Sequence, residues 1–491
     1  MTQRLSSAAL PALPADVARP PYDRDAVRIG IVHLGLGAFH RAHQAVATEA
    51  VLAGGDHAWG IAGVSLRSPD TRDALEPQDG LYTVAVRSGE GDRFQVVGAI
   101  LRQLVAPEDP EAVLALMAAP TTRIVSLTVT EKGYCHLPAT GELDRDHPDI
   151  VHDLANPHAP RSAPGFLVEA LHRRRERGLP PFTVLSCDNL PANGETARRV
   201  VSAFAELRGA ALGGFVAREV PFPSTMVDRI VPATTDADRA LVAGALGRED
   251  AWPVMTEPFS QWVIEDRFAD GRPDWTVGGA RFVADVEPFE LMKLRLLNGS
   301  HSTLAYLGYL AGHETVSQAM ADEPFAALLA GMMSQEIAPT LPPLFGFDLA
   351  AYRAELLERF RNPALRHRTW QIAMDGSQKV PQRLLGTIRD RLRAGEPFER
   401  LALGLAGWIR YAGGRDERGG TIDVRDPMAA RLRALTDGAG EDPARLVDAF
   451  LTVQDVFGDD LPADPRFRRA VTEALGRLLA VGSAAAVAER A

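Results

Sequence analysis

Short apolar runs alternate with amphipathic stretches through the first half of the chain. The apolar runs cover residues 29–35, 59–66, 123–130 and 182–189. Helical patterns lie between or after them, at 39–52, 111–119, 166–175 and 194–207, and residues 81–88 and 94–100 resemble a pair of added strands. Apolar strands separated by helices predict a mainly parallel, doubly wound α/β sheet with helices on both faces.

The pattern changes near residue 285. Beyond it the strand signals thin out, and long helical patterns such as 287–312 and 396–413 follow. We therefore predict an N-terminal arm over 1–27, a dinucleotide-binding Rossmann-type domain over 28–285 and a mainly α-helical domain over 286–491. Prolines interrupt the arm, which favours a poorly ordered or surface-draped segment and not a signal peptide.

Composition narrows the classes of partner. Lys and Arg number 53 and Asp and Glu 64, which gives a formal net charge of −11. This balance argues against a nucleic-acid or anionic-membrane partner, and no apolar stretch approaches the roughly 20 residues of a membrane helix. The two cysteines, Cys135 and Cys187, form no Cys-x-x-Cys pair, as expected in a reducing cytoplasm. We expect a small-molecule ligand and a monomer or small homo-oligomer.

The segment "IVHLGLGAFHRAHQ" (31–44) places Gly35-x-Gly37 between the first strand and a helix. Glycines at such a turn let the backbone approach a dinucleotide pyrophosphate. The third glycine of the dinucleotide fingerprint is missing, so a simple tight turn is an equal alternative. A metal site is the weaker alternative, because His40 and His43 have no carboxylate or cysteine at ligand spacing nearby.

The second strand does not end in the acidic residue that usually binds the ribose. It ends in Ser65, Leu66 and Arg67. Since Arg67 could favour a 2′-phosphate, the choice between NAD and NADP stays open on these residues.

The segment "ELMKLRLLNGSHS" carries Lys293, Asn298 and His301 on one predicted helix. At 3.6 residues per turn, His301 lies one turn beyond Asn298 and roughly 80° around from Lys293. Burial lowers the pKa of a lysine, so its neutral amine could accept the proton of an alcohol. The alternative is a lysine that reaches solvent while Asn298 and His301 satisfy backbone groups.

Three further segments follow predicted strands or separate helices. "SCDNLPANG" places Asn189 at the carboxyl end of the sheet, where doubly wound folds bind ligands, unless it is a turn residue beside the caps Asp188 and Asn193. "TVTEKGY" contains Thr130 and Glu131 at the same edge, and "FPSTMVDRIVP" places Asp228 in a loop.

Taken in order, six motifs resemble the mannitol dehydrogenase family, the zinc-independent polyol-specific long-chain dehydrogenases and reductases. They are "GLGAFHRAHQ", "TVTEKGY", "SCDNLPANG", "FPSTMVDRIVPAT", "EPFSQWVIEDRF" and "KLRLLNGSH". The resemblance covers residues 28 to about 480. It implies a Rossmann-type domain, a helical C-terminal domain, a nicotinamide cofactor and no metal.

The resemblance also implies residue roles. Lys293 matches the catalytic base, Asn189 and Asn298 match the pair that polarises the reacting oxygen, and His301 matches the substrate-orienting histidine. Glu131 and Glu290 match acidic positions near the proton path. The implied cofactor-binding residues are Gly35, Leu36, Gly37, Ala38, Phe39, Arg41, Arg67, Thr130 and Asp228.

The segment "NPALRHRTWQIAMDGSQKVPQRLL" (362–385) bears on the substrate. Polyol dehydrogenases of the family tend to carry an arginine where this chain has Gln371. The sequence of the segment resembles the fructuronate reductase (mannonate oxidoreductase) branch. That branch acts on a hexuronate, whose carboxylate needs cationic donors, and His367, Arg368 and Lys379 are available. We therefore expect an NAD-dependent enzyme that interconverts D-fructuronate and D-mannonate. The alternatives are a mannitol or arabinitol 2-dehydrogenase and a dinucleotide-binding protein without catalysis.

Overall fold

The computed structural model describes residues 3–137, 140–365 and 367–491. The chain forms two compact units, Met1–Glu287 and Pro288–Ala491. We refer to them as the N-terminal unit and the C-terminal unit, and each is described by itself.

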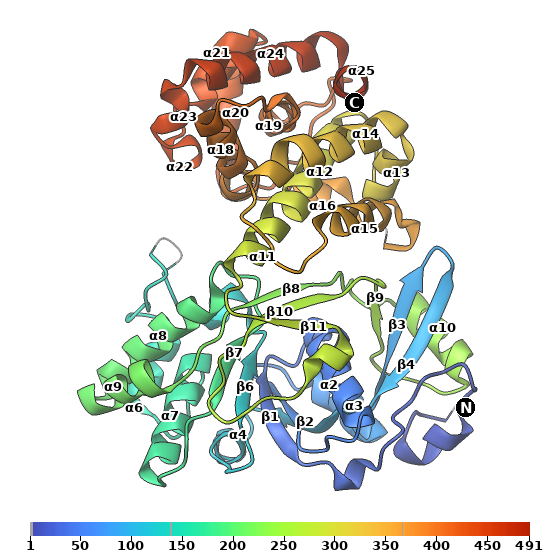
Figure 1. The fold of residues 1–491 in the computed structure, drawn as a ribbon, viewed down its shortest axis with the longest axis vertical. Helices are drawn as coiled ribbons and strands as arrows, with labels where there is room; N and C mark the ends of the chain where they lie inside the picture. The colour runs from blue at the N-terminus through green and yellow to red at the C-terminus, as the bar shows by residue number, and fades with distance from the viewer. Residues whose placement is uncertain (1–2, 138–139, 366) are drawn as a thin grey trace. The chain divides into compact units, whose positions relative to one another are not determined.

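A parallel sheet of five strands forms the centre of the N-terminal unit, in the spatial order β5-β2-β1-β6-β7 (Figure 1). In chain order these strands run 3-2-1-4-5, which is the Rossmann arrangement. The direction of winding therefore reverses between β1 and β6, and the prediction of a doubly wound parallel sheet is confirmed. The strands are β1 (Ile29–Leu34), β2 (Gly60–Ser65), β5 (Ile100–Val105), β6 (Ile124–Leu127) and β7 (Thr183–Ser186).

Both faces of this sheet are buried, because its side chains alternate between two cores. Val32 and Leu34 of β1 belong to one core, with helices α4, α7, α8 and α9, whereas Ile31 belongs to the other, with α2 and Trp262. The helices named are α2 (Gln44–Ala53), α4 (Pro110–Met117), α7 (Ala163–Glu176), α8 (Asn193–Arg208) and α9 (Ala210–Glu219).

Two smaller sheets also belong to this unit. In one, β3 (Tyr82–Ser88) pairs with β4 (Gly91–Val97) in antiparallel fashion and with β9 (Val254–Thr256) in parallel fashion. In the other, β10 (Gln261–Glu265) lies between β8 (Thr225–Asp228) and β11 (Ala280–Val283). The remaining α-helices of the unit are α1 (Ala38–Ala42), α3 (Asp70–Leu75), α5 (Thr130–Gly133), α6 (Pro148–Ala155) and α10 (Asp236–Leu246).

Two sequence-based expectations differ from the structure here. The apolar run 94–100 does not form one strand: it ends β4, and Ile100 begins β5, an edge strand whose half-exposed side chains hide it from the apolar pattern. The helix expected over 39–52 is broken at His43, which joins α1 and α2. The His43 ring bonds instead to the carbonyl of Gln261 at 3.0 Å.

The N-terminal arm packs on the unit and is not a poorly ordered tail. Leu5, Leu13 and Val17 are buried with residues of β3, β4 and α10. The arm contains the 3₁₀ segments η1 (Ser7–Ala12) and η2 (Arg24–Ala26), and Ala18 bridges to Gln95 of β4.

The C-terminal unit is helical in its described residues. Helix α12 packs on α19, and α19 packs on α24. Gly404 permits the first contact, because a Cβ there would lie 2.5 Å from Oγ1 of Thr303. The α-helices are α11 (Glu287–Met292), α12 (Ser300–Leu310), α13 (Val316–Ala321), α14 (Glu323–Gly331), α15 (Leu349–Arg361), α16 (Thr369–Ala373), α17 (Gly376–Val380), α18 (Gly386–Ala394), α19 (Glu399–Ala412), α20 (Ala429–Ala439), α21 (Pro443–Phe450), α22 (Gln454–Phe457), α23 (Asp460–Ala463), α24 (Pro465–Val481) and α25 (Ser483–Arg490).

Three π-helical segments interrupt this pattern, η5 (Lys293–Gly299), η6 (Met332–Ile337) and η9 (Pro381–Leu385). No helix in the described ranges of the chain combines the length and the apolar character needed to cross a membrane.

Candidate active site

The glycine turn after β1 is shaped by the end of β6. Gly35 has φ +101°, a left-handed conformation that favours glycine. A Cβ at this position would lie 2.1 Å from the carbonyl oxygen of Thr128, and the Thr128 hydroxyl donates to the Gly35 carbonyl at 2.8 Å. Gly37 then caps α1 in extended conformation. The turn is therefore tight and lies at the edge where the sheet reverses its winding.

Two buried histidines, His33 and His40, support this turn, and no sequence motif singles out His33. The ring nitrogens of His33 hydrogen-bond with the hydroxyls of Ser126 and Thr128, both at 2.8 Å. The His40 ring stacks on that of His33 with 3.4 Å between centroids. Burial lowers the pKa of both rings, that of His33 to about 3. They are thus neutral packing groups, and their polar partners are protein atoms.

The two arginines expected near the cofactor have different surroundings. Arg67 is exposed and follows the end of β2. Arg41 is only 1% exposed, and its guanidinium donates to the carbonyl of Trp252 at 2.6 Å and lies over the ring of Tyr82. The Arg41 side chain is therefore engaged in packing within the unit.

Asp188 joins the loops that follow β6 and β7. Its carboxylate accepts the backbone N–H groups of Val129 and Thr130 at 3.1 and 2.8 Å and the hydroxyl of Tyr134 at 2.8 Å. Burial raises its pKa, and these hydrogen bonds partly oppose the rise. Asp188 therefore does not cap α8, the helix that follows it in the chain, and its carboxylate instead binds the backbone N–H groups at the start of α5.

Asn193 also does not cap a helix from outside. It is the first residue of α8, and its side chain bonds to the backbone of Asp188 and Thr225. This network leaves the neighbouring Asn189 exposed at the end of β7. Asp228, expected in a loop, is instead the buried last residue of β8.

The lysine, asparagine and histidine of the C-terminal unit lie on one continuous helical stretch, as predicted, but its winding differs. Lys293 begins the π-helical segment η5, Asn298 lies near its end, and His301 is in the first turn of α12. The angle expected for 3.6 residues per turn therefore does not apply, because a π-helix is wound more widely. Short π-helical segments inside α-helices are frequent at functional sites. Lys293 and His301 are each 8% exposed.

The His301 ring is held among aromatic and basic groups. Its centroid lies 4.5 Å from that of Phe360 and 5.2 Å from that of His367. Burial, followed by the charges of His367, Arg359 and Arg383, holds its pKa well below the usual value. His301 is therefore a neutral imidazole at pH 7.

The residues expected to bind a substrate carboxylate are not equivalent. His367 is half-buried, whereas Arg368 is exposed at the start of α16. Lys379 donates to the carbonyl of Met374 at 2.6 Å, and burial together with the charge of Arg383 lowers its pKa.

Sequence reasoning missed two arginines of this region, Arg359 and Arg383. Both act on the His301 ring through their charge. The sequence does contain a signal for Arg383. It follows Lys379 by four residues, and this spacing places two cations on one face of a helix. No sequence spacing links Arg359 to His301, because α15 lies far from His301 along the chain.

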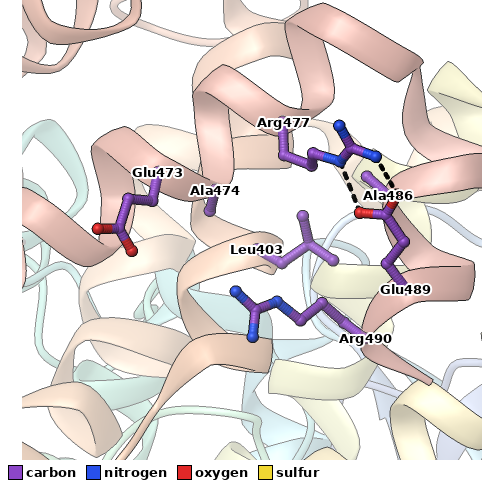
Figure 2. A pocket seen from close by; sticks show the side chains of 7 residues that line it. All are labelled: Leu403, Glu473, Ala474, Arg477, Ala486, Glu489 and Arg490. Carbon is purple, nitrogen blue, oxygen red and sulfur yellow. Dashed lines mark hydrogen bonds and ion pairs between the residues drawn. The ribbon is translucent and has the colours of Figure 1, made fainter.

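Two other features do not include any of the predicted site residues. The ligand atoms of Cys135, His147 and Asp149 all lie within 4.8 Å of one another, a grouping that could hold a metal ion. A pocket of about 240 Å³ lies in the C-terminal unit. Figure 2 shows two of its lining residues, Arg477 and Glu489, paired with each other. Its lining residues are Leu403, Glu473, Ala474, Arg477, Ala486, Glu489 and Arg490.

Comparison with known proteins accounts for both units. The family model described as the mannitol dehydrogenase Rossmann domain matches residues 29–277, and the model of the mannitol dehydrogenase C-terminal domain matches residues 285–479. D-mannonate oxidoreductase of Escherichia coli is 50% identical over 477 residues, 96% of this chain and 98% of that protein.

Polyol dehydrogenases are similar to almost the same extent. Mannitol 2-dehydrogenase of Aspergillus terreus is 46% identical over 465 residues, 93% of this chain and 92% of that protein. The solved structure of Pseudomonas fluorescens mannitol 2-dehydrogenase with NAD and D-mannitol is 40% identical, covers 99% of both chains and has a TM-score of 0.83.

Proposed function

The chain belongs to the mannitol dehydrogenase family, and from this premise we propose that it interconverts D-fructuronate and D-mannonate with NAD. It is an oxidoreductase acting on CH–OH groups, as its relatives are. The observation that carries the proposal is the buried Lys293 at the head of the π-helical segment that also contains Asn298 and leads into His301.

The N-terminal unit has the features that a dinucleotide needs. A sheet wound in the Rossmann order binds its ligand beyond the carboxyl ends of its strands, where the winding reverses. Gly35 and Gly37, which carry no side chains, follow β1 at this point. NAD, when bound, would carry the hydride of the reaction. We propose that it is held by Gly35, Leu36, Gly37, Ala38, Phe39, Arg67, Thr130 and Asp228.

We leave Arg41 out of this set because its guanidinium is buried against Trp252 and Tyr82. Arg67 is the exposed residue after β2, and no carboxylate ends that strand. NADP is therefore the alternative cofactor, and the relative whose structure was solved with NAD favours NAD.

In this proposal, a residue of the C-terminal unit transfers the proton of the reacting hydroxyl. In the oxidation of mannonate, the neutral Nζ of Lys293 accepts the hydroxyl proton as the same carbon loses its hydride. In the reduction of fructuronate, the protonated Nζ returns that proton to the carbonyl oxygen. Burial favours the neutral amine that a base requires.

Neutral donors would position the reacting oxygen. We propose that the amide N–H groups of Asn298 and Asn189 stabilise the charge that develops on it. His301 orients the substrate as a neutral imidazole, because its lowered pKa keeps it unprotonated. None of these roles needs a metal ion.

The hexuronate is favoured over a neutral polyol by two observations. The relative named D-mannonate oxidoreductase is 50% identical, and Gln371 stands where polyol dehydrogenases tend to have arginine. Arg368 and Lys379 supply positive charge in the same segment, and His367 beside them has a pKa lowered by burial. The second candidate is a mannitol or arabinitol 2-dehydrogenase, supported by relatives named mannitol 2-dehydrogenase.

A substrate panel tests the proposal. The purified full chain is assayed with NADH and NADPH on fructuronate, tagaturonate and fructose, and with NAD and NADP on mannonate, mannitol and arabinitol. We expect the highest kcat/KM on fructuronate and mannonate with the non-phosphorylated cofactor. A preference for mannitol and fructose over the two acids would instead establish the polyol dehydrogenase.

A further inference from the structure

Positive charge gathers around the His301 ring in the C-terminal unit. The charged groups are the guanidiniums of Arg359 and Arg383, and the His367 ring, whose centroid is 5.2 Å away, has a pKa lowered by burial. They come from three separate stretches, since Arg359 lies in α15, His367 precedes α16 and Arg383 lies in η9. We call His301, Arg359, His367 and Arg383 the basic cluster.

The clustering is a property of the fold, because its members lie on separate segments of the chain. Like charges that lie close together repel, and burial removes the water that would screen them. Burial lowers the pKa of Arg383, and the charge of Arg359 lowers the pKa of His367 further. A cluster of this kind is stabilised when an anion binds to it.

Arg383 has unused hydrogen-bonding capacity. Its Nη1 donates to the hydroxyl of Ser302 at 3.2 Å. Within residues 3–137, 140–365 and 367–491, this is its one side-chain hydrogen bond, and no carboxylate forms an ion pair with it. A guanidinium has five N–H donors, so most of them remain for a ligand. The buried Ser302 fixes the direction of the group.

The other cations near the cluster are less suited to an anion. The ammonium of Lys379 donates to the carbonyls of Met374 and Ile372, at 2.6 and 3.5 Å, and lies 3.9 Å from the carboxylate of Asp375. Arg368 is exposed, where water screens its charge. The half-buried Arg383 therefore offers the strongest recognition of a carboxylate.

We propose that Arg383, oriented by Ser302 and supported by the charge of Arg359, binds the carboxylate of the sugar-acid substrate and thereby selects it over a neutral polyol. The inference rests on the proposed function, because it names the residue that recognises the acid group of that substrate. A guanidinium binds a carboxylate through two parallel N–H···O hydrogen bonds. The neighbouring His301 then faces the rest of the same molecule.

The central experiment replaces Arg383 by glutamine and compares two ketoses that differ at the acid group. Loss of a charged hydrogen-bond partner is expected to lower kcat/KM for fructuronate by roughly 30- to 1000-fold. Most of the loss should appear as a higher KM, because the contact is remote from the reacting carbon and is equal in ground and transition states. The kcat/KM for fructose should change by less than about threefold, because fructose has no carboxylate for Arg383 to bind.

Three variants make the result specific. Arg361→Gln is the matched control, since it removes an exposed arginine of α15 that pairs with Glu358, and it should leave both substrates nearly unaffected. Arg383→Lys keeps the charge without the paired donors and should restore part of the fructuronate activity. Ser302→Ala should weaken fructuronate binding alone, by a smaller factor than Arg383→Gln. If Arg383→Gln does not fold, as judged by circular dichroism, the Arg383→Lys and Ser302→Ala variants test the inference in its place.

The outcomes separate this inference from the proposed function. If the wild-type enzyme prefers fructuronate but Arg383→Gln and Arg383→Lys keep that preference, Arg383 is not the carboxylate ligand. An equal loss on fructuronate and fructose also overturns the inference, because it shows a general structural role. If the wild-type enzyme itself prefers neutral substrates, the proposed function fails first.

Discussion

Gly35 and Thr128 lie in contact where β1 and β6 end, with the Thr128 hydroxyl donating to the Gly35 carbonyl at 2.8 Å. The Thr128 carbonyl oxygen occupies the space on the other side, 2.1 Å from where a Cβ of residue 35 would be. A glycine is therefore required at this position for two reasons, its positive φ and the approach of a neighbouring strand.

Gly35→Ala should destabilise the chain by more than the roughly 1–3 kcal/mol of backbone strain alone. Urea denaturation of the full chain measures this. Gly55→Ala is the matched control, because Gly55 has a similar φ of +97° but nothing within 4 Å of the added Cβ. Equal losses for the two variants would show that the contact with Thr128 is unimportant. Weaker binding of NADH by Gly35→Ala alone, followed by fluorescence, is expected from the proposed cofactor site.

Lys293→Ala should lower kcat by roughly 10²- to 10⁴-fold, the range for loss of a positioned general base. Binding of NADH should change little, because the lysine acts on the hydroxyl proton. The measurement is steady-state kinetics on mannonate together with circular dichroism of the variant.

Lys132→Ala is a suitable control for the Lys293 variant, since Lys132 is exposed. It should retain normal turnover. A folded Lys293→Ala enzyme with near-normal kcat would mean that the buried lysine has a structural role.

Removal of metal ions should leave the activity unchanged, because the proposed base is an amine. The test is exhaustive treatment with EDTA, followed by assay and by elemental analysis of the protein. The grouping of Cys135, His147 and Asp149 makes the elemental analysis necessary. Loss of activity that zinc restores would contradict the proposed mechanism, and a Cys135→Ser variant would then show whether this grouping binds the ion.

Glu49 should make stability fall as pH rises. The carboxyl is 2% exposed and accepts the Tyr22 hydroxyl and the Gly98 N–H, both at 2.8 Å. Burial raises its pKa from 4.5 to about 7. The stabilisation that a raised pKa provides is therefore complete below pH 4.5 and is lost as the pH rises through 7.

Glu49→Gln keeps a neutral acceptor and should abolish that dependence. Between pH 4.5 and 8 the wild-type chain should lose up to about 3 kcal/mol of unfolding free energy relative to the variant. Urea denaturation at several pH values measures the difference. Glu90→Gln, at an exposed site, should follow the wild-type curve. A constant difference between wild type and Glu49→Gln at all pH values would show that Glu49 does not titrate in this range.

The local pattern of the chain is sufficient to predict most regular elements. The apolar runs that become β1, β2, β6 and β7 are buried on both faces, so each is continuous and easily recognised in sequence. The edge strand β5 is half-exposed and has no such run, so it was missed. The sequence also identifies candidate site residues that share one motif. Lys293, Asn298 and His301 are polar residues in an otherwise apolar helical segment.

The tertiary structure decided what those residues contact. Only the fold brings Arg359 and Arg383 to the His301 ring, because they lie on segments far apart in sequence. The π-helical winding of 293–299 also depends on packing, since the sequence fits an ordinary helix equally well. Periodicity reports which face of an element is buried, whereas charge, desolvation and hydrogen bonding at a site are set by neighbours that the sequence does not place.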